Sequence, residues 1–499
     1  MSYSIAKSLK LITIAVAVSY ILLFLYVSLS RIDYEFELEY LESGSILQTE
    51  RIVAGEKLYV SPSIDFVPFI YTPVYFYVSA LSTYLIGTGY FPLRLISFIS
   101  AILCFVLIFQ FVRKESGSTY AGVLACSLYV ATYDLTGTYF DLARVDSLFM
   151  LWMLGALYLL RHYRNSASYF AAGLLFFLAF MTKQSALTVA VPIAIYCLLS
   201  NRKRFAIFAG ILTVTLVVST YWMDSIHGGW YSYYAFDLPS QHQFWSLPFM
   251  EFWPLSIILP MSVAVIAAIA YIHRLISKSD REATWYYLLM STGMLGASWI
   301  SISHLGSDSN SLMPAYACIA ILFGLGVREA LRAAATALRN HRSTIISYIY
   351  VACIIQFASL MYNPFDRLPK DSDALAGEQF VSMLSGMPGD IYIPNHPYLA
   401  VQAGKPPYAH SMALRDILKG EDGSIKAQFT AELLGALEER RFSVVVLDNK
   451  PWWFDDEVGE CYCLLDTTTI AGSDFWPVSG ARTKPERIFG ECPSDTTSY

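Results

Sequence analysis

Charged residues are scarce in this 499-residue chain, because Asp, Glu, Lys and Arg together make up only 15% of it. Hydrophobic residues make up 55%, which is far too much for a soluble protein of this length. The composition therefore excludes a soluble globular protein and predicts an α-helical integral membrane protein. The net charge of −6 gives no indication of a nucleic-acid partner.

Several catalytic motifs are also missing. The sequence contains no Gly-rich nucleotide loop, no HExxH zinc motif and no GxSxG nucleophile elbow. A soluble nucleotide donor therefore has no recognisable binding site. Internal repeats and low-complexity tracts are absent as well.

Cysteine is sparse, and five of the eight cysteines stand singly in apolar segments, where they are expected to be small packing residues. The other three, Cys461, Cys463 and Cys492, lie in a polar region. Their spacing matches no common zinc site. A disulfide is an alternative if this region faces an oxidising compartment.

Long apolar runs, in contrast, are numerous. The first, 11–28, is long enough to span a bilayer and too long for an ordinary signal-peptide core, so we expect a retained signal anchor. Ten more spans are expected, for about eleven in all, at 92–112, 118–138, 147–161, 167–182, 184–200, 204–224, 253–273, 284–303, 311–328 and 343–362.

The apolar segment 71–90 is ambiguous, and the distribution of Lys and Arg decides how we interpret it. Cytoplasmic loops collect these residues. If 71–90 does not cross the membrane, every strongly basic loop falls on one side, namely 113–114, 161–164, 202–204, 274–281 and 328–342. We therefore expect 71–90 to be an amphipathic or re-entrant helix on the outer surface.

The same topology places several polar loops outside the cytoplasm, together with everything after Met361. The chain is expected to divide into a membrane domain, 1–362, with a first external loop at 30–91, and an extracytoplasmic domain, 363–499. In the second part, 389–394 and 442–448 have the pattern of strands and 427–440 that of an amphipathic helix. A small α/β domain is predicted there.

The first external loop opens with an acidic segment that has carboxylates at 33, 35, 37, 39 and 42. A carboxylate at a membrane surface can act as a general base or can orient a cation. A solvated collar of acids without a catalytic role is the alternative.

Four other outer turns carry candidate residues. Asp141, Arg144 and Asp146 share a short loop, although Asp146 could simply cap a helix. Lys183 could bind a lipid-linked phosphate or could snorkel to lipid headgroups. The turn 304–310 faces the expected site, although on its own it is interpreted as a turn with no further role. The aromatic loop 227–242 could stack on a sugar or form an interfacial belt.

Taken in order, these segments resemble the GT-C superfamily of membrane glycosyltransferases. The resemblance is to the branch of protein mannosyltransferases and the aminoarabinose transferase of lipid A (glycosyltransferase family 39). It rests on the acidic first loop and on five segments that follow it: Ala54-Gly-Glu-Lys-Leu-Tyr59, Tyr71-Thr-Pro-Val-Tyr75, Pro92-Leu-Arg-Leu-Ile-Ser97, Arg144-Val-Asp146 and Thr182-Lys-Gln184.

The resemblance implies a GT-C bundle with outer juxtamembrane helices and a site on the outer face of a bacterial inner membrane. It implies Glu42 as the first-loop base, with Glu39 as the near competitor, and Asp146 as a second acid that shapes the site. Lys183, with Arg144 or Arg94, would hold the donor phosphate. Tyr71, Gln184, His242 and His304 are the expected substrate-binding residues.

The function implied is inverting transfer of a hexose or pentose from a polyprenyl-phosphate donor to a hydroxyl of a lipid, glycan or protein acceptor. The resemblance admits a divalent cation without requiring one. A transporter of polyprenyl lipids or glycans is the main alternative, and it predicts ionisable residues buried in mid-span. A membrane scaffold with a glycan-binding C-terminal domain is a third.

Overall fold

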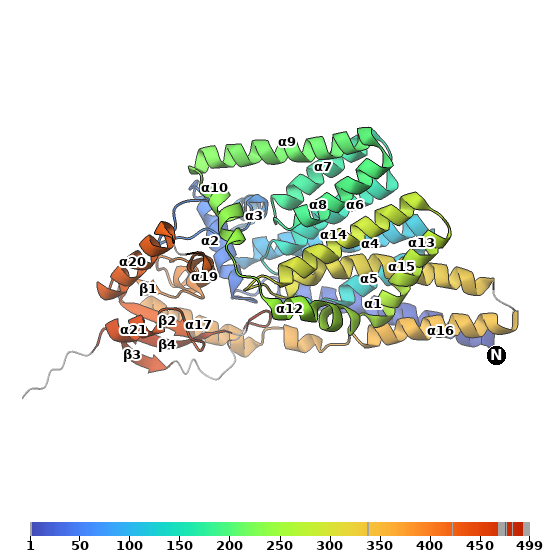
Figure 1. Cartoon of the computed structure of the whole chain (residues 1–499). Helices are drawn as coiled ribbons and strands as arrows, with labels where there is room; N and C mark the ends of the chain where they lie inside the picture. The colour runs from blue at the N-terminus through green and yellow to red at the C-terminus, as the bar shows by residue number, and fades with distance from the viewer. Residues whose placement is uncertain are drawn as a thin grey trace, which may run out of the picture.

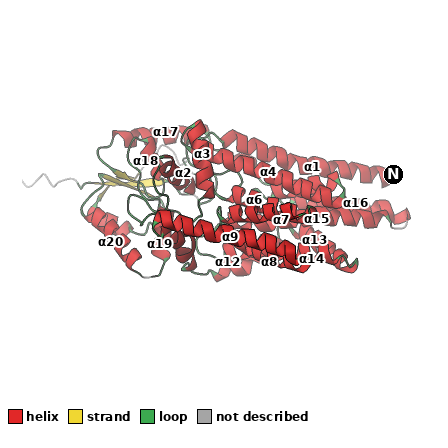
Figure 2. Cartoon of the chain, turned by 90° about the horizontal axis from the view of Figure 1, so that it is seen from above, coloured by secondary structure: helices red, strands yellow, loops and turns green. Residues whose placement is uncertain are grey.

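The computed structural model describes residues 2–336, 339–421, 423–467, 475, 477–481 and 483–492. Within these ranges a long bundle of helices is joined at one end to a group of short helices and strands formed by the C-terminal part of the chain (Figures 1 and 2). The N-terminus lies at the opposite end of the bundle. The predicted combination of a helical membrane protein with a small C-terminal α/β domain is confirmed.

Each predicted span coincides with a helix of the bundle. These helices are α1 (Ser2–Arg31), α4 (Tyr90–Ser116), α5 (Thr119–Ala131), α6 (Asp146–His162), α7 (Ser166–Phe180), α8 (Ala186–Ser200), α9 (Arg202–His227), α13 (Ser262–Ser277), α14 (Arg281–Ile302), α15 (Met313–Ala335) and α16 (Arg339–Ala358). By length and composition alone, four described helices can cross a membrane, or five with one bent pair. The number of spans therefore stays a prediction.

The bent pair replaces the single straight span expected at 253–273. A helical segment formed by α12 (Ser246–Glu251) and the π-helix η2 (Phe252–Ile258) meets α13 at 88°. Pro260 lies in the break between them. Because proline has no backbone N–H and clashes with the preceding turn, a helix bends sharply there.

The ambiguous segment 71–90 forms the short helix α3 (Val74–Ile86), which packs against α2 (Leu41–Val53). Its 13 residues reach only about 20 Å at 1.5 Å per residue, less than the hydrocarbon core of a bilayer. This length supports the expected non-crossing helix. The remaining short helices are α10 (Trp230–Ser232), η1 (Tyr233–Asp237), α11 (Leu238–Ser240), η3 (Ser309–Leu312) and η4 (Pro364–Arg367).

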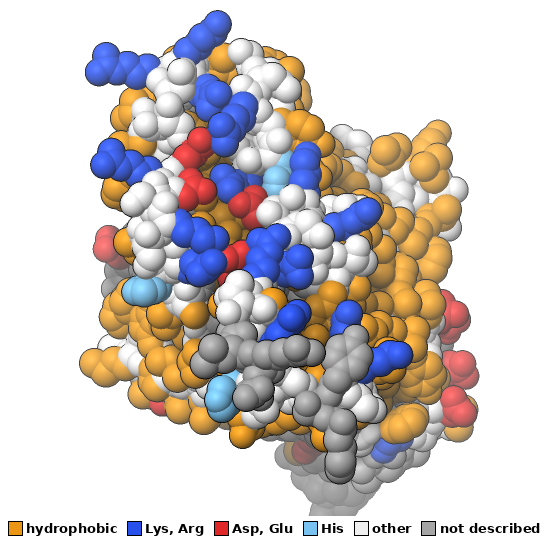
Figure 3. Space-filling model, turned by 90° about the vertical axis from the view of Figure 1, so that its right-hand side faces the viewer, with side chains coloured by type: hydrophobic (Ala, Val, Ile, Leu, Met, Phe, Trp, Pro, Cys, Tyr) orange, Lys and Arg blue, Asp and Glu red, His pale blue; other side chains and the backbone are white. Residues whose placement is uncertain are grey.

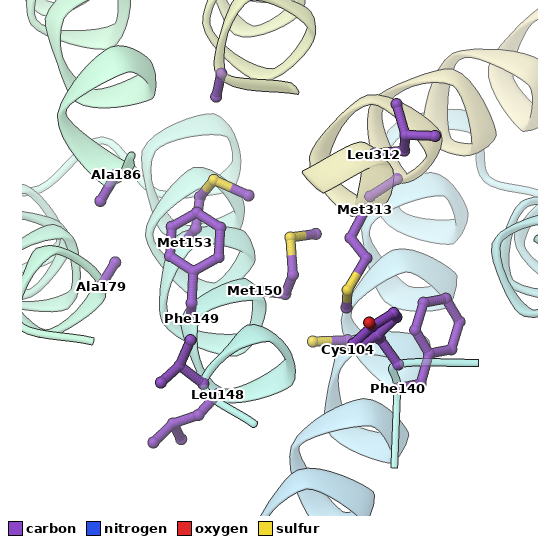
Figure 4. Packing of buried hydrophobic residues seen from close by; sticks show 14 of the residues in the cluster. Cys104, Phe140, Leu148, Phe149, Met150, Met153, Ala179, Ala186, Leu312 and Met313 are labelled. Carbon is purple, nitrogen blue, oxygen red and sulfur yellow. The ribbon is translucent and has the colours of Figure 1, made fainter. Parts of the chain in front are cut away.

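Buried apolar side chains fill the space between the bundle helices. Figure 4 shows Met150 of α6 and Met313 of α15 on facing helices, with Cys104 of α4 and Phe140 close by. Methionine adapts its shape to irregular gaps. Cys104 and the other four cysteines of the apolar segments are buried thiols, so their expected packing role is confirmed.

Basic residues mark the end of the bundle where the N-terminus lies. Arg113 and Lys114 are in the last turn of α4, and Arg161 is in the last turn of α6. The space-filling view of this end shows many Lys and Arg side chains around a few acids (Figure 3). The helix ends therefore have the segregated charge that the topology argument predicts.

The C-terminal part contains a four-stranded sheet in the order β1-β2-β4-β3. The strands are β1 (Ile391–Tyr392), β2 (Val444–Asp448), β3 (Cys463–Thr467) and β4 (Pro485–Gly490), and the accompanying helices are α17 (Asp371–Gly386), α18 (Pro397–Gln402), α19 (Ser411–Lys419), α20 (Ser424–Glu438) and α21 (Asp455–Cys461). β1 runs parallel to β2, and β4 is antiparallel to both neighbours. The two strands and the helix predicted here are confirmed as β1, β2 and α20. A disulfide joins Cys463 to Cys492.

A buried histidine fastens this sheet to the first loop. The imidazole of His396 contacts the carboxylate of Glu37 through Nδ1 and lies 3.2 Å from Asp448 Oδ2 through Nε2. Burial lowers the pKa of His396, but the two carboxylates more than offset this and raise it to about 10. The histidine is therefore charged at neutral pH and bridges the two parts of the chain.

This bridge predicts a pH-dependent contribution to stability. Because the folded-state pKa of His396 exceeds its unfolded value of about 6.5, its contribution is complete below that pH and is lost as the pH rises towards about 10. We expect His396→Gln to lower the thermal unfolding temperature at pH 6, and the difference from wild type to shrink by pH 9.5. The exposed His273→Gln is the control. A difference that is constant with pH would contradict the bridge.

Candidate functional site

A cavity of about 510 Å³ lies where the bundle meets the C-terminal helices. Its walls come from the first loop, the 139–144 loop, the turn after α7, the 239–242 and 300–311 segments, and α19. Several of the loops expected on the outer side converge here. Seven of the ten site residues predicted from the sequence line this cavity: Glu39, Tyr71, Arg144, Lys183, Gln184, His242 and His304.

Glu42, the first choice for the catalytic base, is not among them. Its two oxygens accept hydrogen bonds from Arg94 at 3.0 and 2.6 Å and from the backbone N–H groups of Leu38 and Ala143, both at 2.8 Å. The side chains of Glu42 and Arg94 are both fully buried. A carboxylate with four such donors has no free lone pair directed at a substrate, so the expectation for Glu42 is corrected.

Arg94 was expected to help hold the donor phosphate, and this is also corrected. Besides binding Glu42, its guanidinium donates to the backbone carbonyls of Tyr34 and Phe36, at 2.6 and 2.7 Å. All of its nitrogens have partners within the protein. Arg94 therefore fixes the path of the acidic loop from beneath the cavity.

Glu39, three residues before Glu42, is held differently. Its Oε2 accepts from Arg144 Nη1 at 2.9 Å and from the backbone N–H of Leu41 at 3.2 Å. Its Oε1 is buried and has no hydrogen-bond partner among the described residues. Burial raises the pKa of Glu39 to about 7, against the opposing effect of Arg144. Glu39 thus has one oxygen without a hydrogen-bond partner among the described residues and a pKa suited to proton transfer near neutral pH.

A glycine from the C-terminal part packs on this acid. Gly480 has a φ of +62°, and a Cβ added there would lie 2.6 Å from Glu39 Cγ and 2.8 Å from Tyr139 Oη. Neighbouring Ser479 donates its backbone N–H to the carbonyl of Leu38 at 2.9 Å. The segment 477–481 therefore holds Glu39 in place, and only glycine fits at 480.

Lys183 and Asp146 form the second charged group. Lys183 Nζ lies 2.7 Å from Asp146 Oδ1, which also accepts from Asn310 Nδ2 at 3.0 Å. Asp146 lies behind the wall of the 510 Å³ cavity, whereas the Lys183 side chain is 14% exposed and lines it. The lysine is thus oriented by a buried acid and is itself part of the cavity wall.

Tyr71 and Gln184 make hydrogen bonds beside the Glu39–Arg144 and Lys183–Asp146 pairs. Arg144 Nη2 donates to Tyr71 Oη at 3.2 Å. Gln184 donates to the carbonyls of Ile70 and Ala235, at 2.5 and 3.2 Å. These contacts fix the cavity wall next to Arg144 and Lys183.

The sequence did not single out Tyr139, Asp308 or Asp416, which also line the cavity. Tyr139 Oη donates to Asp308 Oδ2 at 2.8 Å. Tyr139 lies in the same loop as Asp141, and Asp308 lies in the turn 304–310, so a Tyr and an Asp in two candidate loops were a detectable signal. Asp416 lies 377 residues after Glu39 (416 − 39), in a helix with no recognisable motif, and no local pattern could place it.

No group of three His, Cys, Asp or Glu side chains in the described residues has an arrangement able to hold a metal ion. The cavity nevertheless contains three carboxylates, those of Glu39, Asp308 and Asp416. Whether the protein uses a divalent cation therefore stays a prediction, which a chelator can test.

Comparison with known proteins gives two kinds of match. Residues 70–223 match the family model described as dolichyl-phosphate-mannose-protein mannosyltransferase. This range includes Tyr71, Arg144, Asp146 and Lys183. No curated protein sequence matches the chain.

Solved structures match over most of the chain. ArnT from Cupriavidus metallidurans in the apo state has a TM-score of 0.58 at 12% identity, with coverage of 96% of this chain and 100% of that chain. The same protein bound to undecaprenyl phosphate has a TM-score of 0.56 at 12% identity, covering 95% and 98%. The archaeal oligosaccharyltransferase AglB from Archaeoglobus fulgidus, in complex with an inhibitory peptide and a dolichol-phosphate, has a TM-score of 0.55 at 10% identity, covering 87% and 69%.

The fully buried Glu42–Arg94 pair predicts a stability defect. Glu42→Gln leaves Arg94 charged and incompletely paired, and breaking such a pair costs about 3–5 kcal/mol. We expect a strongly lowered unfolding temperature in detergent and a lower yield of folded protein. Glu56→Gln, which breaks an exposed pair with Arg51, should cost less than about 1 kcal/mol. Wild-type stability of Glu42→Gln would rule out the structural role.

Proposed function

We propose that this chain, which has the GT-C fold of membrane glycosyltransferases, transfers a sugar from a polyprenyl-phosphate donor to an acceptor hydroxyl. The resemblance to the GT-C superfamily predicted from the sequence is confirmed by the family model and the fold. The observation that carries the proposal is the Oε1 of Glu39, which is unpaired among the described residues and belongs to a residue that lines the same cavity as Lys183 and Arg144.

Lys183 and Arg144 are proposed to bind the donor phosphate. An ammonium group serves as a point charge for phosphate, and a guanidinium supplies directed N–H donors. Arg144 is tied to Glu39, and Lys183 is tied to Asp146. The phosphate would therefore lie beside the proposed base.

Glu39 is proposed to act as the general base. Its Oε1 takes the proton of the acceptor hydroxyl while the acceptor oxygen attacks the anomeric carbon. The bond from this carbon to the phosphate oxygen breaks, and the polyprenyl phosphate leaves with the electron pair. Attack opposite the leaving group gives inversion. The two cations stabilise the charge that develops on the phosphate.

The cavity is proposed to face the outside of a bacterial inner membrane. The basic helix ends lie at the other end of the bundle, where the positive-inside rule places the cytoplasm (Figures 1 and 3). The Cys463–Cys492 disulfide is consistent with an oxidising compartment on the cavity side. One solved relative contains undecaprenyl phosphate and another dolichol-phosphate, which supports a polyprenyl carrier here.

The transporter alternative expects ionisable residues buried in mid-span. Here the buried pairs Arg31–Asp141, Arg94–Glu42 and Arg144–Glu39 use loop residues and helix ends on the cavity side. This distribution suits a reaction site at the membrane surface. The acceptor is proposed to be a hydroxyl of a lipid, glycan or protein.

The role of Glu39 predicts a selective loss of turnover. Glu39→Gln keeps the size and the contact to Arg144 but cannot accept a proton, so kcat should fall by about 10²–10⁴. Donor affinity should change little, and thermal stability should fall less than in Glu42→Gln, because Arg144 also lies 3.8 Å from the Asp146 carboxylate. Transfer of labelled sugar by purified protein, with and without a chelator, measures this. The exposed Glu35→Gln in the same loop is the control. An active Glu39→Gln would remove this residue from the mechanism.

The pH profile provides a second test. A base must be ionised, and burial raises the pKa of Glu39 to about 7. Thus kcat/KM should rise with pH up to about 7 and then level off. Burial also raises the pKa of Asp416 to about 7. If ionisation of Glu39 causes the rise of kcat/KM with pH, the Asp416→Asn variant should show the same rise. A flat profile between pH 5.5 and 8 would contradict the assignment.

Lys183 should control donor binding. In Lys183→Gln an amide can still donate to Asp146, but the positive charge is lost. We expect KM for the donor to rise at least about 10-fold, and Lys183→Arg to keep most of the affinity because it retains the charge. Binding of the bare polyprenyl phosphate should weaken in parallel. Unchanged phosphate-lipid affinity in Lys183→Gln would place the phosphate elsewhere.

A further inference from the structure

One wall of the cavity belongs to α19, which is fastened to two loops of the membrane part. At its start, His410 Nε2 donates to the carbonyl of Tyr40 at 2.9 Å, and its Nδ1 accepts from the N–H of Met412 at 3.0 Å. At its end, Lys419 Nζ donates to the carbonyl of Leu305 at 3.1 Å. Met412 and Asp416, one turn apart, both line the cavity. The position of α19 is therefore fixed at both ends.

Asp416 lies in the wall of the cavity. The residue is only 3% exposed. Its nearest partner is His242, whose Nε2 lies 3.7 Å from Asp416 Oδ1, which is beyond hydrogen-bond distance. That Nε2 is itself buried and has no hydrogen-bond partner among the described residues. The imidazole Nε2 of His242 is thus a buried polar atom without a described partner beside the Asp416 carboxylate, which is costly unless a ligand completes it.

We infer that Asp416 and His242 form a subsite that recognises adjacent hydroxyl groups of a sugar ring, either the donor sugar or a glycan acceptor. One hydroxyl donates to the carboxylate, and its neighbour accepts from the imidazole Nε2–H. A separation of 3.7 Å between the two protein atoms suits ligand atoms that bond to each of them side by side. This inference rests on the proposed function, because it assigns a sugar-binding role within the same cavity.

The surrounding charges favour a neutral hydroxyl pair over an ionic group. A phosphate would be repelled by the Asp416 carboxylate and has Lys183 and Arg144 elsewhere in the cavity wall. An ammonium group is disfavoured because Arg415 and Lys419 already supply positive charge near Asp416. Burial lowers the pKa of His242, which keeps its imidazole neutral at pH 7. Met412 adds an apolar surface beside the carboxylate.

The test measures binding to the purified full-length protein in detergent. Three probes are compared: bare polyprenyl phosphate, the same lipid bearing a neutral hexose, and a panel of soluble methyl glycosides. Asp416→Asn preserves size, and His242→Gln is a second variant if the first does not fold. Glu438→Gln, an exposed acid on α20, is the matched control. Unfolding temperatures establish that each variant is folded.

We expect Asp416→Asn and His242→Gln to weaken a sugar-bearing probe at least about 10-fold and to leave bare polyprenyl phosphate unchanged. Loss confined to the hexose lipid identifies the donor sugar, and loss confined to the glycosides identifies the acceptor. Equal affinity of both folded variants and wild type for every sugar probe would overturn the subsite, as would a wild type that binds no sugar probe better than the bare lipid.

The transfer reaction separates this failure from that of the proposed function. If wild type transfers sugar and Asp416→Asn does so with unchanged KM for donor and acceptor, the subsite is wrong and the proposed function stands. If wild type binds the glycosides through Asp416 but transfers no sugar, the subsite stands and the proposed function fails.

Discussion

The site depends on how two glutamates, three residues apart on one loop, are partnered by two arginines. Glu42 is fully buried and receives four N–H donors, two of them from Arg94. Glu39 is bound by Arg144 through one oxygen only, and its other oxygen is unpaired. A charged carboxylate can be buried at tolerable cost only when it is paired and hydrogen-bonded. The complete pairing of Glu42 therefore fixes the loop, whereas Glu39 keeps one oxygen without a partner in the described chain, which is the basis for proposing it as the base.

The other charged residues of the site are linked to Glu39 through a series of contacts. Arg144, which orients Glu39, lies two residues before Asp146, and Asp146 in turn orients Lys183. The 477–481 segment packs Gly480 on Glu39, while α19 brings Asp416 to the cavity wall. The C-terminal part is thus a component of the site, held to the first loop by the His396 bridge. Loops between the bundle helices supply Arg144 and Lys183, and the C-terminal part forms another wall of the cavity.

Much of this arrangement was predictable from the sequence. Hydropathy located every bundle helix, and the placement of Lys and Arg indicated that 71–90 does not cross. The order of short motifs placed Glu39, Arg144, Lys183 and Gln184 in one outer site. Spacing alone could not rank Glu42 against Glu39, because the ranking depends on which arginine each one meets in three dimensions.

The role of Arg94 and the positions of Asp416 and Gly480 could not be predicted from the sequence either, because they too depend on three-dimensional contacts. Arg94 lies at an outer helix end, where a phosphate ligand is plausible, but its guanidinium turns towards the loop carbonyls. Asp416 and Gly480 reach the cavity through long-range packing, and no local pattern of residues encodes such packing. The sequence thus predicts which loops meet, whereas the division between structural and reactive charges requires the folded geometry.

The central claim is that donor phosphate and acceptor base meet at Lys183, Arg144 and Glu39. A cryo-electron microscopy structure with an intact polyprenyl-phosphate sugar bound tests it most directly. The account predicts phosphate density in contact with Lys183 and Arg144, and an anomeric carbon whose open face is directed towards Glu39 Oε1. Phosphate bound outside this cavity, or a sugar whose anomeric carbon faces away from Glu39, would contradict it.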